Sequence, residues 1–182
     1  MSSLPSRPLQ SQHSIGLYTS HKQHNRLGPP IPIPTPATNS LPTSYVVLAA
    51  ASTFILGIAH TANTGIYRKA ANVPYPLAYA AASDTSPAAF QFNCAQRAHA
   101  NYVENQVQTV PALLIAGLVY PKTAAVMGAV WTVSRFMYMR GYSKGEEGGK
   151  GRYKKGGAAF WLPQLGLAVL SVMTGASLVL GW

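Results

Sequence analysis

The sequence predicts an all-α membrane protein, a bundle of four transmembrane helices. Only 10% of its residues are charged, whereas a soluble domain of similar size carries about 25%. Hydrophobic residues make up 48% of the 182 residues, and they concentrate in four apolar segments beyond residue 44. A chain of this length has room for one such domain and an N-terminal tail.

The tail, residues 1–43, is rich in proline and contains no acidic residue. Proline lacks a backbone hydrogen-bond donor and interrupts helices, so we expect this segment to be disordered or locally polyproline II. It lacks the compact apolar core of a secretory signal, and its prolines disfavour the amphipathic helix of a mitochondrial transit peptide. We therefore expect a tail over 1–43 and a helical domain over 44–182.

Four segments are apolar enough to cross a bilayer: 45–67, 88–120, 123–142 and 158–182. The first is closed by Arg68 and Lys69, at the expected membrane surface. The fourth would span about 37 Å as a helix, more than the hydrocarbon core of about 30 Å. Pro163 falls in its first turns, where a helix tolerates proline. We therefore expect four membrane-spanning helices.

Basic residues gather in the loops that follow the first and third segments: Arg68, Lys69, Arg140, Lys144, Lys150, Arg152, Lys154 and Lys155. The short loop after the second segment offers Lys122. Because basic loops stay in the cytosol, we place the first and third loops there and both termini across the membrane. This arrangement accounts for the net charge of +10, so we expect no nucleic-acid partner.

The second segment carries a polar stripe inside the expected membrane. Arg97, Asn101, Glu104 and Gln108 are spaced i, i+4, i+7 and i+11, which places them on one narrow face of a helix. Inserting a charged side chain at bilayer depth costs at least ~2.5 kcal/mol of free energy, so we expect these residues to have a structural or functional role there. Snorkelling to the surface would explain Arg97 alone, but the side chain of Glu104 is short and lies deeper. We favour a binding site between helices over a purely structural polar seam.

The third segment presents a matching face, with Trp131, Arg135, Tyr138 and Tyr142 at the same spacing. The Gly-rich basic stretch 141–152 follows and can bring a further cation over this face. Arginine binds carboxylates through paired hydrogen bonds, and tyrosine hydroxyls with a cation stabilise a thiolate. Glutathione, with two carboxylates, one ammonium group and one thiol, fits this set.

Other polar residues of the second segment point away from the stripe. His99 and Gln106 lie on the opposite face, where a lone histidine is usually a hydrogen-bonded packing residue. Cys94 is the single cysteine of the chain, which excludes an intrachain disulfide. With no second ligand at suitable spacing around His99, we expect no metal site.

The stretch 92–104, FNCAQRAHANYVE, resembles the second-helix signature of the MAPEG superfamily of membrane proteins in eicosanoid and glutathione metabolism. Within the superfamily it is most similar to the type 3 microsomal glutathione transferases. The resemblance covers about residues 45–182 and extends to Tyr75-Pro76, Tyr120-Pro121, the series from Arg135 to Tyr142, and Gly181-Trp182.

The resemblance implies a four-helix transmembrane bundle that forms a homotrimer. It also implies that glutathione, as co-substrate, binds between neighbouring subunits near the cytosolic face, so we expect the third-helix face to come from a neighbouring subunit. The residues that match the family's glutathione contacts are Arg97, His99, Asn101, Glu104, Arg135, Tyr138, Tyr142 and Lys69.

The family's sulfur-contacting arginine has no direct counterpart here. Counted from Tyr142 without a gap, the position of this arginine falls on Gly149. The nearest cationic residues are Lys150 and Arg152. We favour Arg152, assisted by Tyr142 or Tyr138, because its charge is permanent and the glycines permit a shifted loop. The chain also has Val107 where the family usually has proline.

The resemblance implies a glutathione transferase that conjugates the thiolate to lipophilic electrophiles and reduces lipid hydroperoxides. A leukotriene-C4-synthase-like conjugation is one form of this activity. The alternative is a non-catalytic lipid-binding scaffold resembling the 5-lipoxygenase-activating protein. A transporter subunit is disfavoured because the chain has no internal repeat. Expected partners are glutathione, the lipophilic acceptor, membrane lipids and two further copies of the chain. The expected location is the endoplasmic reticulum or the outer mitochondrial membrane.

Overall fold

The computed structural model describes residues 41–181, which are mostly helical with no strand among them. The expected disorder of the tail falls almost entirely outside the described residues. The helices in chain order are α1 (Leu41–Ala70), α2 (Pro87–Gly117), α3 (Pro121–Ser143), α4 (Glu146–Gly149), the 3-10 helices η2 (Lys150–Tyr153) and η3 (Gly157–Phe160), and α5 (Trp161–Leu180).

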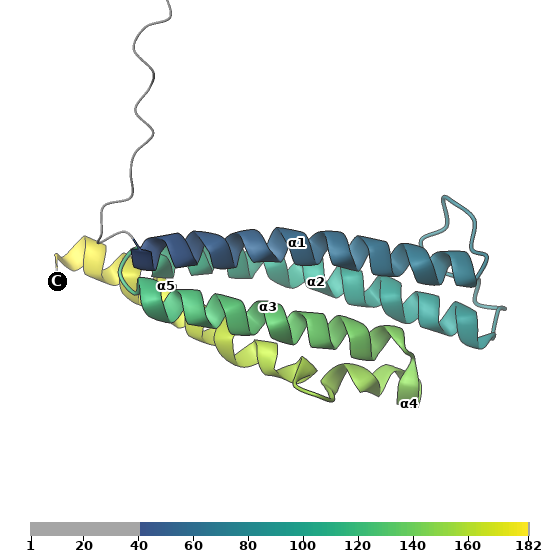
Figure 1. Ribbon diagram of the computed structural model, residues 1–182. Helices are drawn as coiled ribbons and strands as arrows, with labels where there is room; N and C mark the ends of the chain where they lie inside the picture. Colours follow the sequence, from purple (N-terminus) through teal and green to yellow (C-terminus); the bar gives the residue numbers. More distant parts are fainter. Residues whose placement is uncertain (1–40, 182) are drawn as a thin grey trace, which may run out of the picture. The chain divides into compact units, whose positions relative to one another are not determined.

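The four long helices α1, α2, α3 and α5 run side by side (Figure 1). Helix α1 packs against α2 and α3, and α5 packs against the same two helices. By length and apolar composition, α1 and the span Gly157–Leu180 are long enough to cross a membrane. The predicted all-α class is confirmed, and α2 and α3 form the centre of the packing.

The helix ends follow local sequence signals and differ slightly from those expected. Helix α1 begins at Leu41, four residues before the expected start, with Pro42 in its first turn. Helix α2 begins after Ser86, whose hydroxyl accepts a hydrogen bond from the backbone N–H of Ala89 at 3.2 Å. It ends at Gly117 rather than near Tyr120, because Pro121 starts the next helix.

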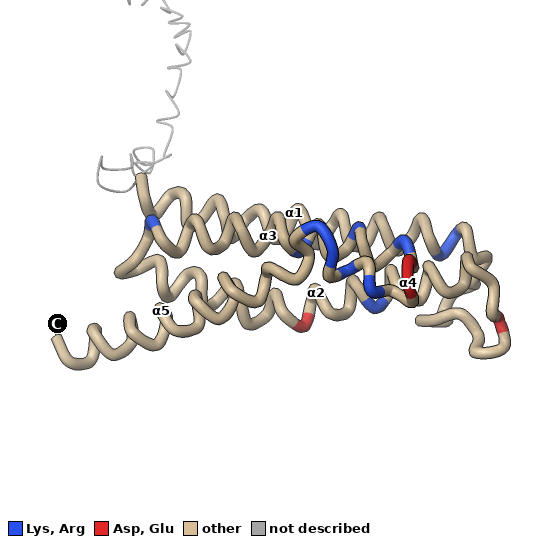
Figure 2. The backbone as a smooth tube through the Cα atoms, turned by 90° about the horizontal axis from the view of Figure 1, so that it is seen from below, with Lys and Arg blue, Asp and Glu red and all other residues tan. Residues whose placement is uncertain are grey.

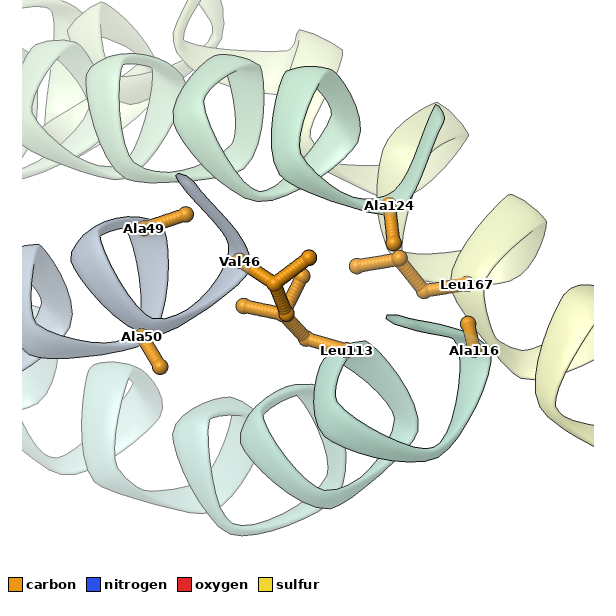
Figure 3. Close-up of a cluster of buried hydrophobic side chains, with 7 residues drawn as sticks. All are labelled: Val46, Ala49, Ala50, Leu113, Ala116, Ala124 and Leu167. Carbon is orange, nitrogen blue, oxygen red and sulfur yellow. The ribbon is translucent and has the colours of Figure 1, made fainter. Parts of the chain in front are cut away.

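Small residues bring the helices close together at the end where α1 begins. A cluster from all four long helices fills this end (Figure 3): Val46, Ala49, Ala50, Leu113, Ala116, Ala124 and Leu167. A Cβ at Gly128 would lie 3.0 Å from the Leu113 side chain and 3.1 Å from that of Ala49, so glycine at this position lets α3 pack closely against α1 and α2. This end of the bundle is apolar and tightly packed.

The opposite end carries the charge. Lys and Arg gather toward α4 (Figure 2), as the distribution of basic loops predicts. Between the two ends lies an aromatic cluster of Leu56, Tyr102, Trp131, Tyr138 and Phe160. The candidate site lies where this aromatic cluster meets the charged end.

Candidate functional site

The α2 stripe forms a connected set of polar contacts. Arg97 pairs with Glu104 through Nη1 and Oε1 at 3.1 Å, and the Asn101 amide donates to the other Glu104 oxygen at 3.5 Å. The side chains of Arg97 and Glu104 are 50% and 53% exposed. A half-exposed ion pair on an apolar helix bundle leaves room for a ligand or a neighbouring subunit to cover it.

Helix α3 joins the stripe within the same chain. The Arg135 side chain is fully buried, and its Nη1 and Nη2 atoms both donate to Oδ1 of Asn101 at 3.0 Å. The guanidinium also lies 4.4 Å from the ring centre of Phe160 and 4.5 Å from that of Tyr138. The expectation that a neighbouring subunit supplies the third-helix face was therefore wrong for Arg135. Two adjacent helices bring it to Asn101 directly.

A line of amides supports Asn101 from behind. Asn105 donates to the backbone carbonyl of Asn101 at 2.7 Å and accepts from Gln164 of α5 at 3.0 Å. Gln164 in turn accepts from the indole N–H of Trp131 at 3.1 Å. Sequence reasoning missed this support. The available signals were Asn105 one turn after Asn101 and Gln164 as an amide in an otherwise apolar segment.

The predicted sulfur-contacting cation lies against the predicted tyrosine. The Arg152 guanidinium is 4.4 Å from the ring centre of Tyr142, and Tyr142 packs edge-on against Tyr138 at 5.7 Å. Arg152 also donates to the carbonyl of Gly149 at 3.0 Å. Lys150 is exposed, and within residues 41–181 its side chain has no hydrogen bond or ion pair. The geometry thus favours Arg152 over Lys150.

Glycines hold the segment that carries Arg152 against α3. A Cβ at Gly141 would overlap the carbonyl oxygen of Gly151, so the two backbones are in direct contact. Gly149 adopts a φ of 82°, a left-handed conformation that allows the sharp turn before η2. These contacts place Arg152 on the side of α3 that bears Tyr142.

Two predicted ligands lie elsewhere in the chain. His99 faces α1, where its ring is 5.9 Å from that of His60, and it lines a cavity of about 210 Å³ with Arg68 and Gln96. Lys69 is exposed at the end of α1, and among the described residues its side chain makes no hydrogen bond or ion pair. The single chain therefore does not bring His99 or Lys69 to the α2 stripe.

The cavity beside His99 has its own ordered cation. Arg68 donates to the carbonyl of Leu77 at 2.6 Å, and its guanidinium lies 4.7 Å from the ring centre of Phe92. Behind His99, the buried His60 ring stacks on Tyr102 at 4.4 Å. The bundle thus has two polar regions, one on each side of α2. Residues 41–181 contain no cluster of His, Cys, Asp and Glu able to hold a metal ion.

The α2 and α3 residues define a class of site. Two arginines, one carboxylate and one amide lie in contact on a helix bundle with apolar exteriors, and a third arginine stands over a tyrosine nearby. Such a set is complementary in charge to a small molecule that carries both carboxylate and ammonium groups. The fold and these contacts therefore define a helical membrane protein with a polar region set into its bundle.

The MAPEG family model matches residues 46–173 of the chain. This range covers most of the sequence, including the α2 stripe and the segment with Arg152, and the chain belongs to the MAPEG family. The family contains glutathione transferases, leukotriene synthases and proteins like the 5-lipoxygenase-activating protein. The protein is accordingly an integral membrane protein of a family associated with glutathione.

Proposed function

We propose that this protein is a membrane glutathione transferase, which conjugates glutathione to lipophilic electrophiles and also reduces lipid hydroperoxides. The observation that carries the proposal is the unbroken line of contacts from Arg97 through Glu104 and Asn101 to Arg135, with Arg152 and Tyr142 nearby. A charge pattern of this kind complements a zwitterion better than it does a neutral lipid.

Each residue has a distinct role in the proposed complex. The guanidinium of Arg97 binds a glutathione carboxylate, and Glu104 binds the ammonium group, so the ligand replaces their mutual ion pair. Asn101 binds an amide of the peptide. Arg135 is a positioning residue, because its two hydrogen bonds fix the orientation of the Asn101 side chain. Tyr138 packs against Arg135 and Tyr142 and orders both.

Arg152 and Tyr142 act on the sulfur. A free thiol has a pKa of about 8.5, and a nearby guanidinium and phenol lower it by stabilising the thiolate. The thiol proton passes to solvent, and the thiolate attacks the electrophilic carbon. A C–S bond forms as the bond to the leaving group or epoxide oxygen breaks.

The same thiolate accounts for hydroperoxide reduction. It attacks the terminal peroxide oxygen, the O–O bond breaks and the lipid leaves as an alcohol. The resulting glutathione sulfenic acid reacts with a second glutathione to give the disulfide and water. Two thiols are thus oxidised for each hydroperoxide reduced.

We further propose that four helices span the membrane and that three chains assemble so that each α2 stripe faces the cavity beside His99 of the next chain. Arg97 is adjacent in sequence to Gln96 and close to His99, so the two polar regions lie at the same depth on different faces of α2. Such an assembly would cover the half-exposed Arg97–Glu104 pair and bring His99 and Lys69 to a neighbour's site. The proposed location is the endoplasmic reticulum, with the outer mitochondrial membrane as the alternative.

The test uses the full-length protein purified in detergent. Glutathione affinity is measured by calorimetry, and turnover is measured with 1-chloro-2,4-dinitrobenzene and with a lipid hydroperoxide. The proposal expects binding and turnover of at least one acceptor. Binding without turnover would support the non-catalytic scaffold, and the absence of glutathione binding would contradict both the site and the activity. As a control, Lys122→Gln removes one positive charge at the opposite end of α3 and should leave glutathione binding and turnover unchanged.

A further inference from the structure

We propose that a second site, on the outer side of α3, binds an anionic glycerophospholipid of the surrounding leaflet. Its phosphate headgroup occupies a basic pocket between the end of α3 and the segment 144–155. One acyl chain lies in an apolar groove that continues from this pocket along α3.

The headgroup pocket has a volume of about 220 Å³ and is strongly basic. Four cationic side chains and one carboxylate line it: Arg140, Lys144, Lys154, Lys155 and Glu146. Its apolar members, Phe136 and Met137, are 43% and 39% exposed. A pocket with this excess of positive charge attracts an anion, and its apolar wall accommodates the glycerol backbone.

Two of the four cations have no partner within the described part of the chain. Lys144 lies 3.9 Å from Glu146, and Lys154 pairs with Glu147. The hydrogen bond with Glu147 raises the pKa of Lys154 above its ordinary value. Over residues 41–181, the side chains of Arg140 and Lys155 make no hydrogen bond or salt bridge. These two groups are free to bind a phosphate.

An apolar groove of about 380 Å³ begins where the basic pocket ends. Met137 and Lys155 line both, which makes the two spaces adjacent. The groove is otherwise lined mainly by small and branched apolar side chains of α3 and η3: Ala129, Val130, Val133 and Ala159. Its composition suits a hydrocarbon chain and not a second polar ligand.

The direction of the combined site matches a lipid in a bilayer. Helix α3 ends at the charged end of the bundle, so Arg140 lies near the membrane surface and Ala129 lies deeper. Eleven residues of helix separate them, a rise of about 16 Å. A phospholipid has the same polarity, with its phosphate at the surface and its chain toward the midplane. A free anion or an acidic peptide would leave the groove empty.

The lipid site is distinct from the proposed glutathione site. Gly141 and Gly151 line the basic pocket and are in backbone contact, whereas Tyr142 and Arg152 are not among its lining residues. The segment that carries the free Lys155 also carries Arg152. Headgroup binding therefore adds a contact that stabilises this segment against α3.

The experiment is native mass spectrometry of the detergent-purified protein, titrated with phosphatidylserine and with phosphatidylcholine of identical chains. We expect preference for phosphatidylserine. Because each basic residue contributes roughly a factor of five to anionic-lipid binding, the double variant Arg140→Gln/Lys155→Gln should weaken it on the order of 30-fold. Lys122→Gln, the same kind of change outside the pocket, should leave the affinity unchanged. Ala159→Phe, which fills the groove, should weaken lipid binding.

Four outcomes would overturn the proposal. These are equal affinity for the two lipids, full affinity in the double variant, an affinity for inorganic phosphate equal to that for phosphatidylserine, and stronger binding of an acidic peptide. Glutathione affinity and the melting temperature of each variant are measured in parallel. Retention of both shows that a loss of lipid binding is local, and the lipid result does not depend on whether the glutathione proposal holds.

Discussion

At the scale of single residues, the buried charge of Arg135 fixes the side chain of Asn101. Its guanidinium is removed from solvent, yet both terminal nitrogens are bound by one oxygen of Asn101. Burying a charge is costly, and aromatic rings with a hydrogen-bonded amide offset only part of that cost. The two hydrogen bonds hold the Asn101 side chain in one orientation at the centre of the polar stripe.

Replacing Arg135 tests this positioning role. Arg135→Leu removes hydrogen bonds to a charged group worth about 1.5–3 kcal/mol, so KM for glutathione should rise on the order of 10- to 100-fold. The kcat at saturation should change much less, because the proposed sulfur contacts are Arg152 and Tyr142, whereas Arg135 acts through Asn101. Arg135→Lys keeps the charge and should restore part of the affinity. Steady-state kinetics measures both constants, and a fall in kcat alone would contradict the assignment.

Variants of the Arg97–Glu104 pair should change glutathione binding without changing the stability of the fold. Both side chains are about half exposed, and an exposed pair contributes less than about 1 kcal/mol. Glu104→Ala and Arg97→Ala should therefore leave the melting temperature nearly unchanged while glutathione affinity falls at least tenfold. Val103→Ala, an exposed neighbour on α2, is the control. Calorimetry decides the matter: unchanged affinity in either variant would make the stripe a structural feature.

Arg152 and Lys150 are neighbours in sequence with different surroundings. Arg152 lies against Tyr142, whereas Lys150 is exposed. Removing a group that stabilises developing charge typically costs a factor of 10²–10³ in rate, so Arg152→Ala should lose about that much kcat. Lys150→Ala should lose little. Turnover at saturating glutathione distinguishes the two, and the reverse pattern would assign the sulfur contact to Lys150.

At the scale of elements, the segment between α3 and α5, which carries the proposed sulfur contact Arg152, has very little regular structure. It consists of short helices joined at glycines with positive φ, including Gly145 at 69° and Gly156 at 85°. Such turns depend on residues that lack a Cβ. Its position comes from the Gly141–Gly151 backbone contact and from Phe160, which packs edge-on against Tyr138.

Gly141→Ala should disturb this segment while leaving the α2 stripe intact. The added Cβ would overlap the Gly151 carbonyl, so the segment must move away from α3 and carry Arg152 with it. We expect kcat to fall at least tenfold with glutathione affinity reduced much less. Gly175→Ala, at a helical glycine of α5 with open space around its Cα, is the control. Equal activity in the two variants would show that the segment position is unimportant.

The long helices follow from local patterns, and the short ones do not. Apolar length, the Ser86 cap and the prolines at helix starts locate α1, α2 and α3 to within about four residues. Residues 157–160 instead form a 3-10 turn before α5, where the sequence predicts a continuous helix. In this 3-10 turn, Gly157 packs closely against the backbone of Arg152 and Tyr138.

At the scale of the whole molecule, the two polar regions on different faces of α2 favour a ring of subunits. The stripe exposes an ion pair, and the other face holds a cavity with Arg68 and His99. A surface that must meet a different surface on the next copy is heterologous, and such contacts form a ring when the rotation between copies closes. The proposed trimer is one such ring.

Mixed trimers test whether sites are shared. Glu104→Ala removes the stripe, and Arg68→Gln/His99→Ala removes the cavity, so each variant alone should bind glutathione weakly. If sites form between chains, co-expression in equal amounts should restore about a quarter of the sites, because one of four pairings has both halves intact. Calorimetry on the co-purified trimer counts them. No recovery would show that each chain carries a complete site.

The sequence by itself determined the helical class, the distribution of charge and the membership of Arg97, Asn101 and Glu104 in one stripe. These depend on periodicity and composition, which are local properties. Tertiary structure decided that Arg135 joins the stripe within the chain, that Gln164 and Asn105 support it, and that His99 faces another cavity. These depend on which helices pack together, and helix packing is set by the small residues that let α1, α2, α3 and α5 approach.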